Sequence, residues 1–226
     1  MKSFNWLLVL SVLSCFGCSS PVHEDDRGCA FVSDSIQYRV EFMSAGCVRI
    51  LSFPEGDTLV TKRLVVDSEK PAFKDYKWED TGQKLLFRTR ELSVVFDKAD
   101  AAFIFQETST GKLLLKEKGD RKARNFKRSV AGGEQCLEVT QRFVPTDGEA
   151  IYGLGQYQNG IMNYRGKSVL LLQANMDIVN PFLISTNGYG VLWDNYSSTK
   201  FEDTKEGYSF TSEVGDASDY YFVYGK

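Results

Sequence analysis

Short runs of alternating apolar and polar residues, separated by turn residues about every 8 to 12 positions, fill the chain from Ser35 onward. The run Ile36–Phe42 reads Ile-Gln-Tyr-Arg-Val-Glu-Phe, and the turn Ser44-Ala-Gly46 separates it from a second run over 47–53. Successive side chains of a strand point to opposite faces, so each run can bury one face. The pattern predicts an antiparallel β-sandwich or barrel, and we find no segment with helical periodicity.

The same pattern continues to the end of the chain, with Asn187-Gly188 as a clear turn between two runs. The chain has 226 residues, of which 42% are hydrophobic, which is enough for one substantial core. We find no internal repeat and no linker after Arg27, so we expect one domain over residues 35–226. The further strands expected are 59–66, 84–89, 92–96, 102–106, 112–115, 134–143, 167–174, 181–186, 189–193, 208–211 and 219–224.

Charge gives no indication of a polyanionic partner, because 27 Lys and Arg face 30 Asp and Glu, for a net charge of -3. Nucleic acid is therefore not an expected partner. The one basic stretch, 116–128, is interrupted by Glu117, Gly119 and Asp120. We interpret this stretch as a solvated loop between strands, with a binding patch as the alternative.

The residue types of the chain give little support for a metal site or a cofactor site. His23 is the only histidine, and no Cys-x-x-Cys pair occurs after Cys15 and Cys18 near the amino terminus, so we expect no zinc or copper site and no cofactor. Cys29, Cys47 and Cys136 form an odd set that allows at most one disulfide. Buried free thiols are the simpler interpretation.

The amino terminus has the features of an export signal, with Lys2 before a short apolar run, Trp6–Leu13, that is too short to span a bilayer. Val12-Leu-Ser-Cys15 resembles a bacterial lipobox, and Phe16-Gly-Cys18 is a competing site. We therefore expect a lipoprotein signal over 1–18 with lipidation at Cys15, or alternatively at Cys18, or else a cleaved secretory signal. A polar tether over 19–34 would hold the domain at a bacterial membrane, on the periplasmic face or cell surface.

A set of motifs in the second half resembles the amino-terminal domain of glycoside hydrolase family 31, and most closely the Bacteroidetes-type bacterial α-xylosidases that act on xyloglucan fragments. Each motif is weak alone, but their order over more than seventy residues is specific. The motifs are Tyr152-Gly-Leu-Gly-Gln156, Asn163-Tyr-Arg-Gly166, Pro181–Gly190, Val191-Leu-Trp-Asp-Asn195, Ser212–Asp216 and Asp219-Tyr-Tyr-Phe-Val-Tyr-Gly225.

This resemblance implies a galactose-mutarotase-like β-sandwich packed against a (β/α)8 barrel. In such enzymes the barrel supplies both aspartates of a retaining mechanism, which requires two carboxylates about 5 to 5.5 Å apart. We expect that this chain ends before the barrel and lacks the catalytic pair. The expected partners are the barrel domain and, through the full-length enzyme, an oligosaccharide substrate.

In this family, the loop that follows Tyr152–Gln156 leans over the barrel mouth and helps to shape the sugar pocket. The alternative is an ordinary polar turn around Gly160, with Arg165 paired to an internal carboxylate. The substrate-binding candidates that the resemblance implies are Tyr157, Gln158, Asn159, Asn163, Tyr164 and Arg165.

Carboxylates near the aromatic region, such as Asp194, Asp203 and Asp219, have no spacing that specifies a facing pair, so we expect structural roles for them. The aromatic residues of 193–196 and 220–224 suggest core or barrel-interface packing rather than a sugar platform, because alternate residues must point inward. We also expect the final strand, 220–224, to form an apolar open edge. A stand-alone lipid-anchored carbohydrate-binding module is the alternative function, whereas mutarotase activity would need a histidine that the domain lacks.

Overall fold

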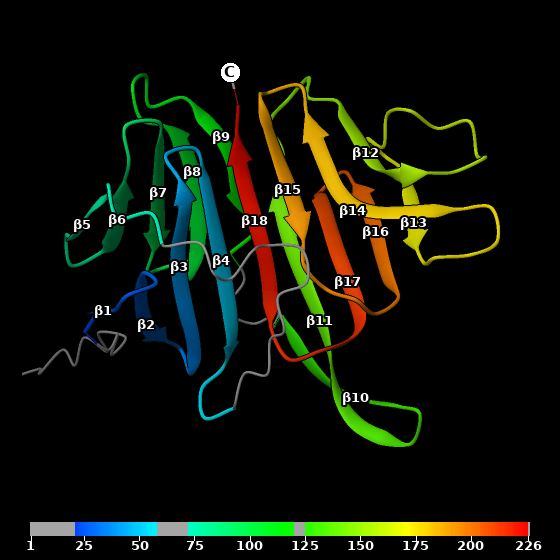
Figure 1. The fold of residues 1–226 in the computed structure, drawn as a ribbon, viewed down its shortest axis with the longest axis horizontal. Helices are drawn as coiled ribbons and strands as arrows, with labels where there is room; N and C mark the ends of the chain where they lie inside the picture. The colour runs from blue at the N-terminus through cyan, green and yellow to red at the C-terminus, as the bar shows by residue number, and fades with distance from the viewer. Residues whose placement is uncertain (1–20, 58–71, 120–124, 226) are drawn as a thin grey trace, which may run out of the picture.

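The computed structural model describes residues 21–57, 72–119 and 125–225. Within these ranges every regular element is a β-strand, all strand pairs are antiparallel, and no helix is long and apolar enough to cross a membrane. Two sheets pack face to face (Figure 1). The predicted all-β sandwich is therefore confirmed, and the strand expected at 59–66 lies outside the described residues.

The first sheet has eight strands and contains both ends of the described chain. The last strand, β18, lies between strands from opposite halves of the sequence (Figure 1). In spatial order the strands are β1 (His23–Glu24), β2 (Cys29–Ser33), β3 (Ile36–Ser44), β4 (Cys47–Pro54), β18 (Ser218–Tyr224), β15 (Tyr189–Trp193), β14 (Ile178–Ser185) and β12 (Ile151–Gln156).

The second sheet has ten strands, one of which, β10 (Phe126–Ala131), pairs only with β11. The hairpin of β10 and β11 projects from the end of the sandwich (Figure 1). The other strands, in spatial order, are β13 (Ser168–Leu171), β16 (Thr199–Thr204), β17 (Gly207–Gly215), β11 (Glu134–Val144), β9 (Leu113–Glu117), β8 (Ala102–Glu107), β7 (Leu92–Asp97), β6 (Lys84–Arg88) and β5 (Lys77–Asp80).

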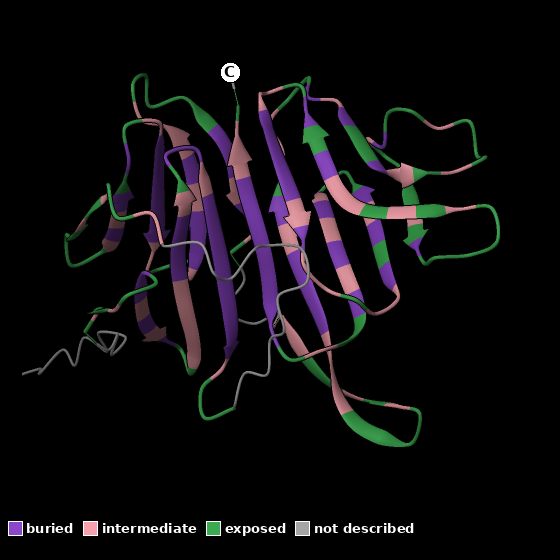
Figure 2. Ribbon diagram, viewed as in Figure 1, coloured by how far each residue is buried: buried purple, intermediate pink, exposed green. Residues whose placement is uncertain are grey.

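Aromatic side chains from both sheets fill the space between them. Phe105 of β8 stacks on Phe222 of β18 with ring centroids 4.2 Å apart, and Trp193 of β15 stacks on Phe210 of β17 at 5.6 Å. Buried residues alternate with less buried ones along β2, β16 and β17, whereas most residues of β4 and β7 are buried (Figure 2). Each fully buried aromatic side chain contributes roughly 1.5 to 3 kcal/mol by leaving water. The expected core packing of Trp193 and of the final strand is confirmed.

The outward face of the first sheet holds a buried ion network that alternation alone does not predict. Arg49 is 1% exposed, and its Nε donates to Asp219 Oδ1 at 2.7 Å while Nη1 donates to Glu41 Oε2 at 3.1 Å. The guanidinium also lies 5.6 Å from the ring of Tyr221. Burial raises the pKa of Asp219 and Arg49 opposes that shift. A buried charge requires such partners, so these residues fix β3, β4 and β18 together.

The first sheet begins earlier in the sequence than predicted. Within the interval expected to be a polar tether, 19–34, β1 and β2 form and β2 pairs with β3. Cys29 and Phe31 of β2 are 0% and 3% exposed and belong to the core. The tether interpretation is thus wrong for these strands, because the short Cys-Ala-Phe-Val-Ser run buries alternate residues although its flanks are polar.

The three cysteines of the described residues are free thiols. Cys29 is buried, and Cys47 and Cys136 are partly buried. Burial raises the pKa of Cys29 and of Cys47 to about 11. A thiol with such a pKa carries little thiolate near neutral pH and is therefore unreactive.

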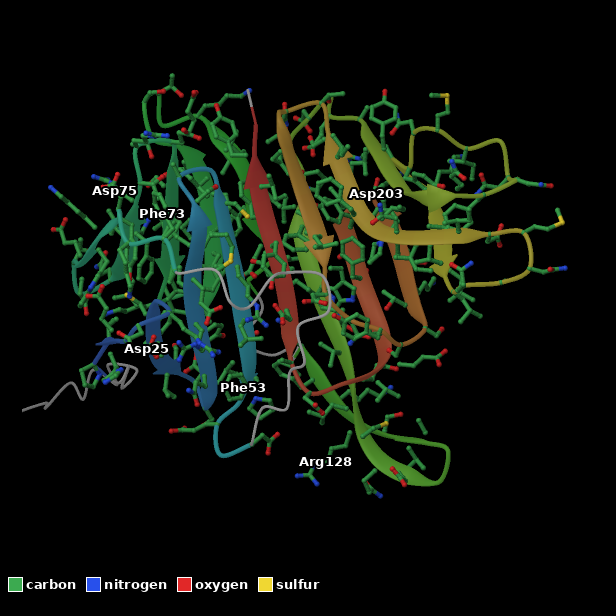
Figure 3. The ribbon with its side chains drawn as sticks, in the orientation of Figure 1. Asp25, Phe53, Phe73, Asp75, Arg128 and Asp203 are labelled. Atoms are coloured by element: carbon green, nitrogen blue, oxygen red, sulfur yellow. The ribbon has the colours of Figure 1, made fainter. Side chains whose placement is uncertain are left out.

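Two further expectations fail for reasons of topology. β18 lies between β4 and β15 and is paired on both sides, so the final strand is not an open edge. The basic stretch 116–128 is only partly a loop, because it includes the end of β9 and the start of β10. Arg128 of β10 lies on the projecting hairpin (Figure 3).

Candidate functional site

The segment Tyr152-Gly-Leu-Gly-Gln156 forms an irregular part of β12 that sets the direction of the following loop. Gly153, Leu154 and Gly155 have φ angles of 99°, 65° and 120°, and the pairing with β14 shifts register here. A Cβ on Gly155 would lie 2.1 Å from the carbonyl oxygen of Ile178. The two glycines therefore allow close approach to β14, while the side chain of Leu154 enters the core at 0% exposure.

The first part of the loop 156–166 presents polar side chains to solvent. Gln158 and Asn159 are exposed, and Asn159 Oδ1 accepts a hydrogen bond from the backbone of Ile161 at 2.9 Å. Tyr157 is half-buried and turns its hydroxyl inward to donate to the Leu154 carbonyl at 3.0 Å. Burial raises the pKa of Tyr157 to about 12. The side chains of Gln156, Gln158 and Asn159 are therefore polar groups of this part that face solvent.

The second part of the loop is tied into the sandwich. Asn163 Oδ1 accepts hydrogen bonds from the backbone N–H groups of Ile151 and Arg165, both at 3.1 Å. Tyr164 is 2% exposed and packs edge-to-face on Phe201 with centroids 6.2 Å apart. Tyr164 is consequently a core residue that holds the loop, and it does not present its side chain to a ligand in this structure.

Arg165 connects the loop to the opposite sheet. Its Nε donates to Asp203 Oδ2 at 2.8 Å, and Nη1 donates to the carbonyl oxygen of Glu149 at 3.3 Å. The same Asp203 oxygen accepts from the backbone of Gly166 at 2.6 Å. Asp203, labelled in Figure 3, comes from β16 of the second sheet, and its side chain is 1% exposed. The arrangement matches the alternative in which Arg165 pairs with an internal carboxylate.

Glu149 stabilises the base of the same loop, a role that the sequence analysis missed. Its carboxylate is buried and accepts hydrogen bonds from Ser185 Oγ at 2.7 Å, from the Tyr189 hydroxyl and from the backbone of Thr146 at 2.8 Å. No sequence motif marks it, since its partners lie up to 40 residues away along the chain.

Exposed apolar side chains occur on β12 and β14 and on the segments next to these strands, and Tyr152 of β12 pairs with Ile184 of β14. We call this set the β12–β14 apolar surface, and Figure 2 shows the exposed segments of these strands. Such a grouping is uncommon on a solvent-facing surface and is typical of an interface. Its members are Tyr152, Met162, Leu172, Met176, Ile178 and Ile184.

Two carboxylates in the second half, Asp203 and Asp219, have structural partners rather than the geometry of a catalytic pair. Asp203 and Asp219 each bind an arginine, and both are buried. Among the residues of 21–57, 72–119 and 125–225, no group of three or more His, Cys, Asp or Glu side chains could hold a metal ion. The site therefore consists of a positioned polar loop beside an apolar surface.

The two-sheet antiparallel sandwich is consistent with a galactose-mutarotase-like domain. Residues 37–202 match the family model described as the glycosyl hydrolase 31 N-terminal galactose mutarotase-like domain. Because this match covers more than half of the sequence, the chain belongs to glycoside hydrolase family 31 as its amino-terminal domain.

Relatives of this chain include two proteins that are described as glycosidases. An α-xylosidase of Saccharolobus solfataricus is 32% identical over 206 residues, which are 84% of this chain and 26% of that protein. An uncharacterised family 31 glucosidase of Pseudescherichia vulneris is 36% identical over 102 residues, 45% of this chain and 19% of that protein. The chain thus spans about a quarter or less of these relatives.

Solved structures show the same domain within longer chains. A family 31 α-xylosidase of Xanthomonas citri superposes with a TM-score of 0.70 and 31% identity, over 81% of this chain and 20% of that chain. A family 31 α-xylosidase from a soil metagenome, complexed with xylose, superposes with a TM-score of 0.76 over 92% of this chain and 32% of that chain. At 21% identity, the second likeness demonstrates the fold alone.

Proposed function

We propose that this chain serves as the non-catalytic amino-terminal domain of a glycoside hydrolase that acts on α-xylosides or α-glucosides such as xyloglucan oligosaccharides. The observation that carries the proposal is the 32% identity to an α-xylosidase across 84% of the chain. Retaining hydrolysis needs two carboxylates about 5 to 5.5 Å apart. We assign that pair to a barrel domain in the longer protein, since Asp203 and Asp219 of this chain are engaged by arginines.

In the longer protein, the loop 156–166 would form part of the sugar pocket. The exposed amides of Gln158 and Asn159 suit hydrogen bonding to sugar hydroxyls. Asn163, Tyr164 and Arg165 would act as positioning residues, because their contacts hold the loop against both sheets.

The β12–β14 apolar surface would carry the contact with the barrel domain. This surface includes residues of β12 and β14, and the loop 156–166 follows β12 directly. A partner that covers the surface would therefore also approach the loop. Burial of apolar side chains is the main driving force for such an interface.

Hydrolysis assays test this proposal. The purified chain should not hydrolyse aryl α-xylosides or α-glucosides above background, because loss of a nucleophile and acid/base costs several orders of magnitude in rate. The same chain continued into a barrel domain should hydrolyse at least one of them. Turnover by the chain alone would contradict the proposal. Saccharide binding without hydrolysis by the longer protein would also contradict it, and this second result is what a stand-alone carbohydrate-binding module predicts.

The amino-terminal segment, residues 1–20, lies outside the described residues, and we propose that it exports and anchors the protein through a lipid on Cys15. A palmitate-analogue label should persist in Cys18→Ser and vanish in Cys15→Ser. The reverse result would move the anchor to Cys18. A protein that takes up no label would have a secretory signal without an anchor.

A further inference from the structure

Two Asn-Gly pairs occur in the sequence, Asn159-Gly160 in the loop 156–166 and Asn187-Gly188 in the turn between β14 and β15. Glycine has no Cβ, so its backbone nitrogen can approach the side chain of a preceding asparagine closely. The two reacting groups belong to adjacent residues, and the reaction therefore needs no second molecule to be bound. The structure places the two pairs in different environments.

The pair Asn159-Gly160 is open to solvent. Both residues are exposed, and a Cβ on Gly160 would meet no atom within 4 Å beyond its chain neighbours. Within residues 21–57, 72–119 and 125–225, no hydrogen bond engages the backbone N–H of Gly160 or the Nδ2 of Asn159. The attacking nitrogen and the leaving amino group are thus both unrestrained.

The side-chain carbonyl of Asn159 is also polarised for attack. Its Oδ1 accepts a hydrogen bond from the backbone N–H of Ile161 at 2.9 Å. Attack on Cγ places negative charge on this oxygen, and a donor that is already in position stabilises such a charge. The turn therefore favours addition of the Gly160 nitrogen to Asn159 Cγ.

The pair Asn187-Gly188 is held by hydrogen bonds on both sides. The N–H of Gly188 donates to the carbonyl of Ser185 at 3.1 Å, and the Gly188 carbonyl accepts from the N–H of Gly225 at 3.0 Å. Asn187 Nδ2 donates to Glu149 Oε2 at 3.2 Å. Attack at Asn187 requires these bonds to break first, so the fold protects this pair.

We propose that Asn159 is a site of spontaneous deamidation and that Asn187 is protected from the same reaction. The bond between the Gly160 nitrogen and Asn159 Cγ forms, the bond between Cγ and Nδ2 breaks, and ammonia leaves with the proton of the Gly160 amide. Water then opens the resulting succinimide at either carbonyl, which gives isoaspartate or aspartate. The reaction needs only the chain and water.

The products change the solvent-facing part of the loop. Both replace the amide donor of Asn159 by a carboxylate, and isoaspartate also lengthens the main chain before Gly160 by a methylene group. A hydrogen bond from Asn159 to a sugar, which rests on the proposed function, would be lost. The modification itself does not depend on that function.

Peptide mapping by mass spectrometry tests the proposal on the folded full chain, incubated at mildly alkaline pH in water that carries a heavy oxygen isotope. The peptide with Asn159 should gain the mass difference between an amide and a carboxyl group, incorporate the label and contain isoaspartate. The peptide with Asn187 should convert at least about tenfold more slowly, because its hydrogen bonds must first break. In the urea-unfolded chain, both peptides should convert at similar rates.

Asn159→Gln is the test variant, and Asn187→Gln is its matched control. Glutamine must close a larger ring and reacts more slowly, so Asn159→Gln should lose the early release of ammonia, whereas Asn187→Gln should retain it. Equal conversion of the two peptides in the folded chain would overturn the proposal. An Asn159 peptide that stays unconverted in the folded chain would overturn it as well.

Discussion

Glu117 is a buried carboxyl group that bridges the two sheets. Its Oε1 accepts from the Tyr220 hydroxyl of the first sheet at 2.6 Å and from Gln141 Nε2 at 2.8 Å, and Oε2 accepts from the backbone of Phe103 at 2.8 Å. Burial raises the pKa of Glu117 to about 7, although the hydrogen bonds from Tyr220 and Phe103 act in the opposite direction. The raised pKa means that the folded state holds the proton more tightly than the unfolded chain does.

This linkage predicts that the domain loses stability as the pH rises from about 4.5 to about 7, the interval between the ordinary and the raised pKa of Glu117. The contribution is fully present below the lower value, and a shift of this size corresponds to roughly 3 kcal/mol. Urea unfolding across this interval measures it. Glu117→Gln should flatten the pH dependence, whereas Glu134→Gln, at an exposed position, should leave it unchanged. An equally steep profile in Glu117→Gln would contradict the assignment.

At the scale of single elements, the irregular stretch of β12 decides where the candidate loop lies. Gly155→Ala would bring a Cβ against the backbone of β14, where no flexible side chain can move aside. We expect the substitution to destabilise the domain by about 3 kcal/mol or more and to expose amides of β14 to hydrogen exchange.

Gly160→Ala is the matched comparison, because Gly160 also has a positive φ, 68°, but a Cβ there would meet nothing within 4 Å. Only the conformational cost of about 1 to 2 kcal/mol applies to it. If Gly155→Ala were no more destabilising than Gly160→Ala in equilibrium unfolding, the close approach of β12 to β14 would not control the loop.

For the whole molecule, the β12–β14 apolar surface predicts self-association of the chain when it is produced by itself. Exposed apolar groups of this extent associate when no partner covers them. Light scattering of residues 21–226 should show dimers or larger species. Met176→Lys with Ile178→Lys should shift them to monomers, because Met176 and Ile178 are 62% and 56% exposed on that surface.

Val130→Lys serves as the control for this experiment, since Val130 is 61% exposed but lies on the β10–β11 hairpin. It should not change the association state. If the unaltered chain is monomeric, the β12–β14 apolar surface is not an interface. In that case, co-expression with a barrel fragment should not increase the solubility of the chain.

The fold class follows from the sequence because alternation is a local property. A run such as Ile36–Phe42 can bury its apolar side chains only by packing one face against a second layer. This holds whichever strand pairs with it. The family assignment also follows from the sequence, because the motifs between Tyr152 and Gly225 keep their order along the chain. The sequence pattern did not predict the strands β5, β10 and β16, because their many polar and charged residues obscure the alternation.

Only the tertiary structure decides which distant residues meet and which face of a strand is covered. Arg49 and Asp219 are 170 positions apart, and their pairing depends on β18 lying beside β4. In the same way, Tyr164 becomes a core residue because β16 places Phe201 beneath it, although its polar neighbours suggested a surface position. Sequence periodicity carries no information on strand order, so the partners of Arg165, Glu117 and Tyr164 become known only when both sheets are assembled.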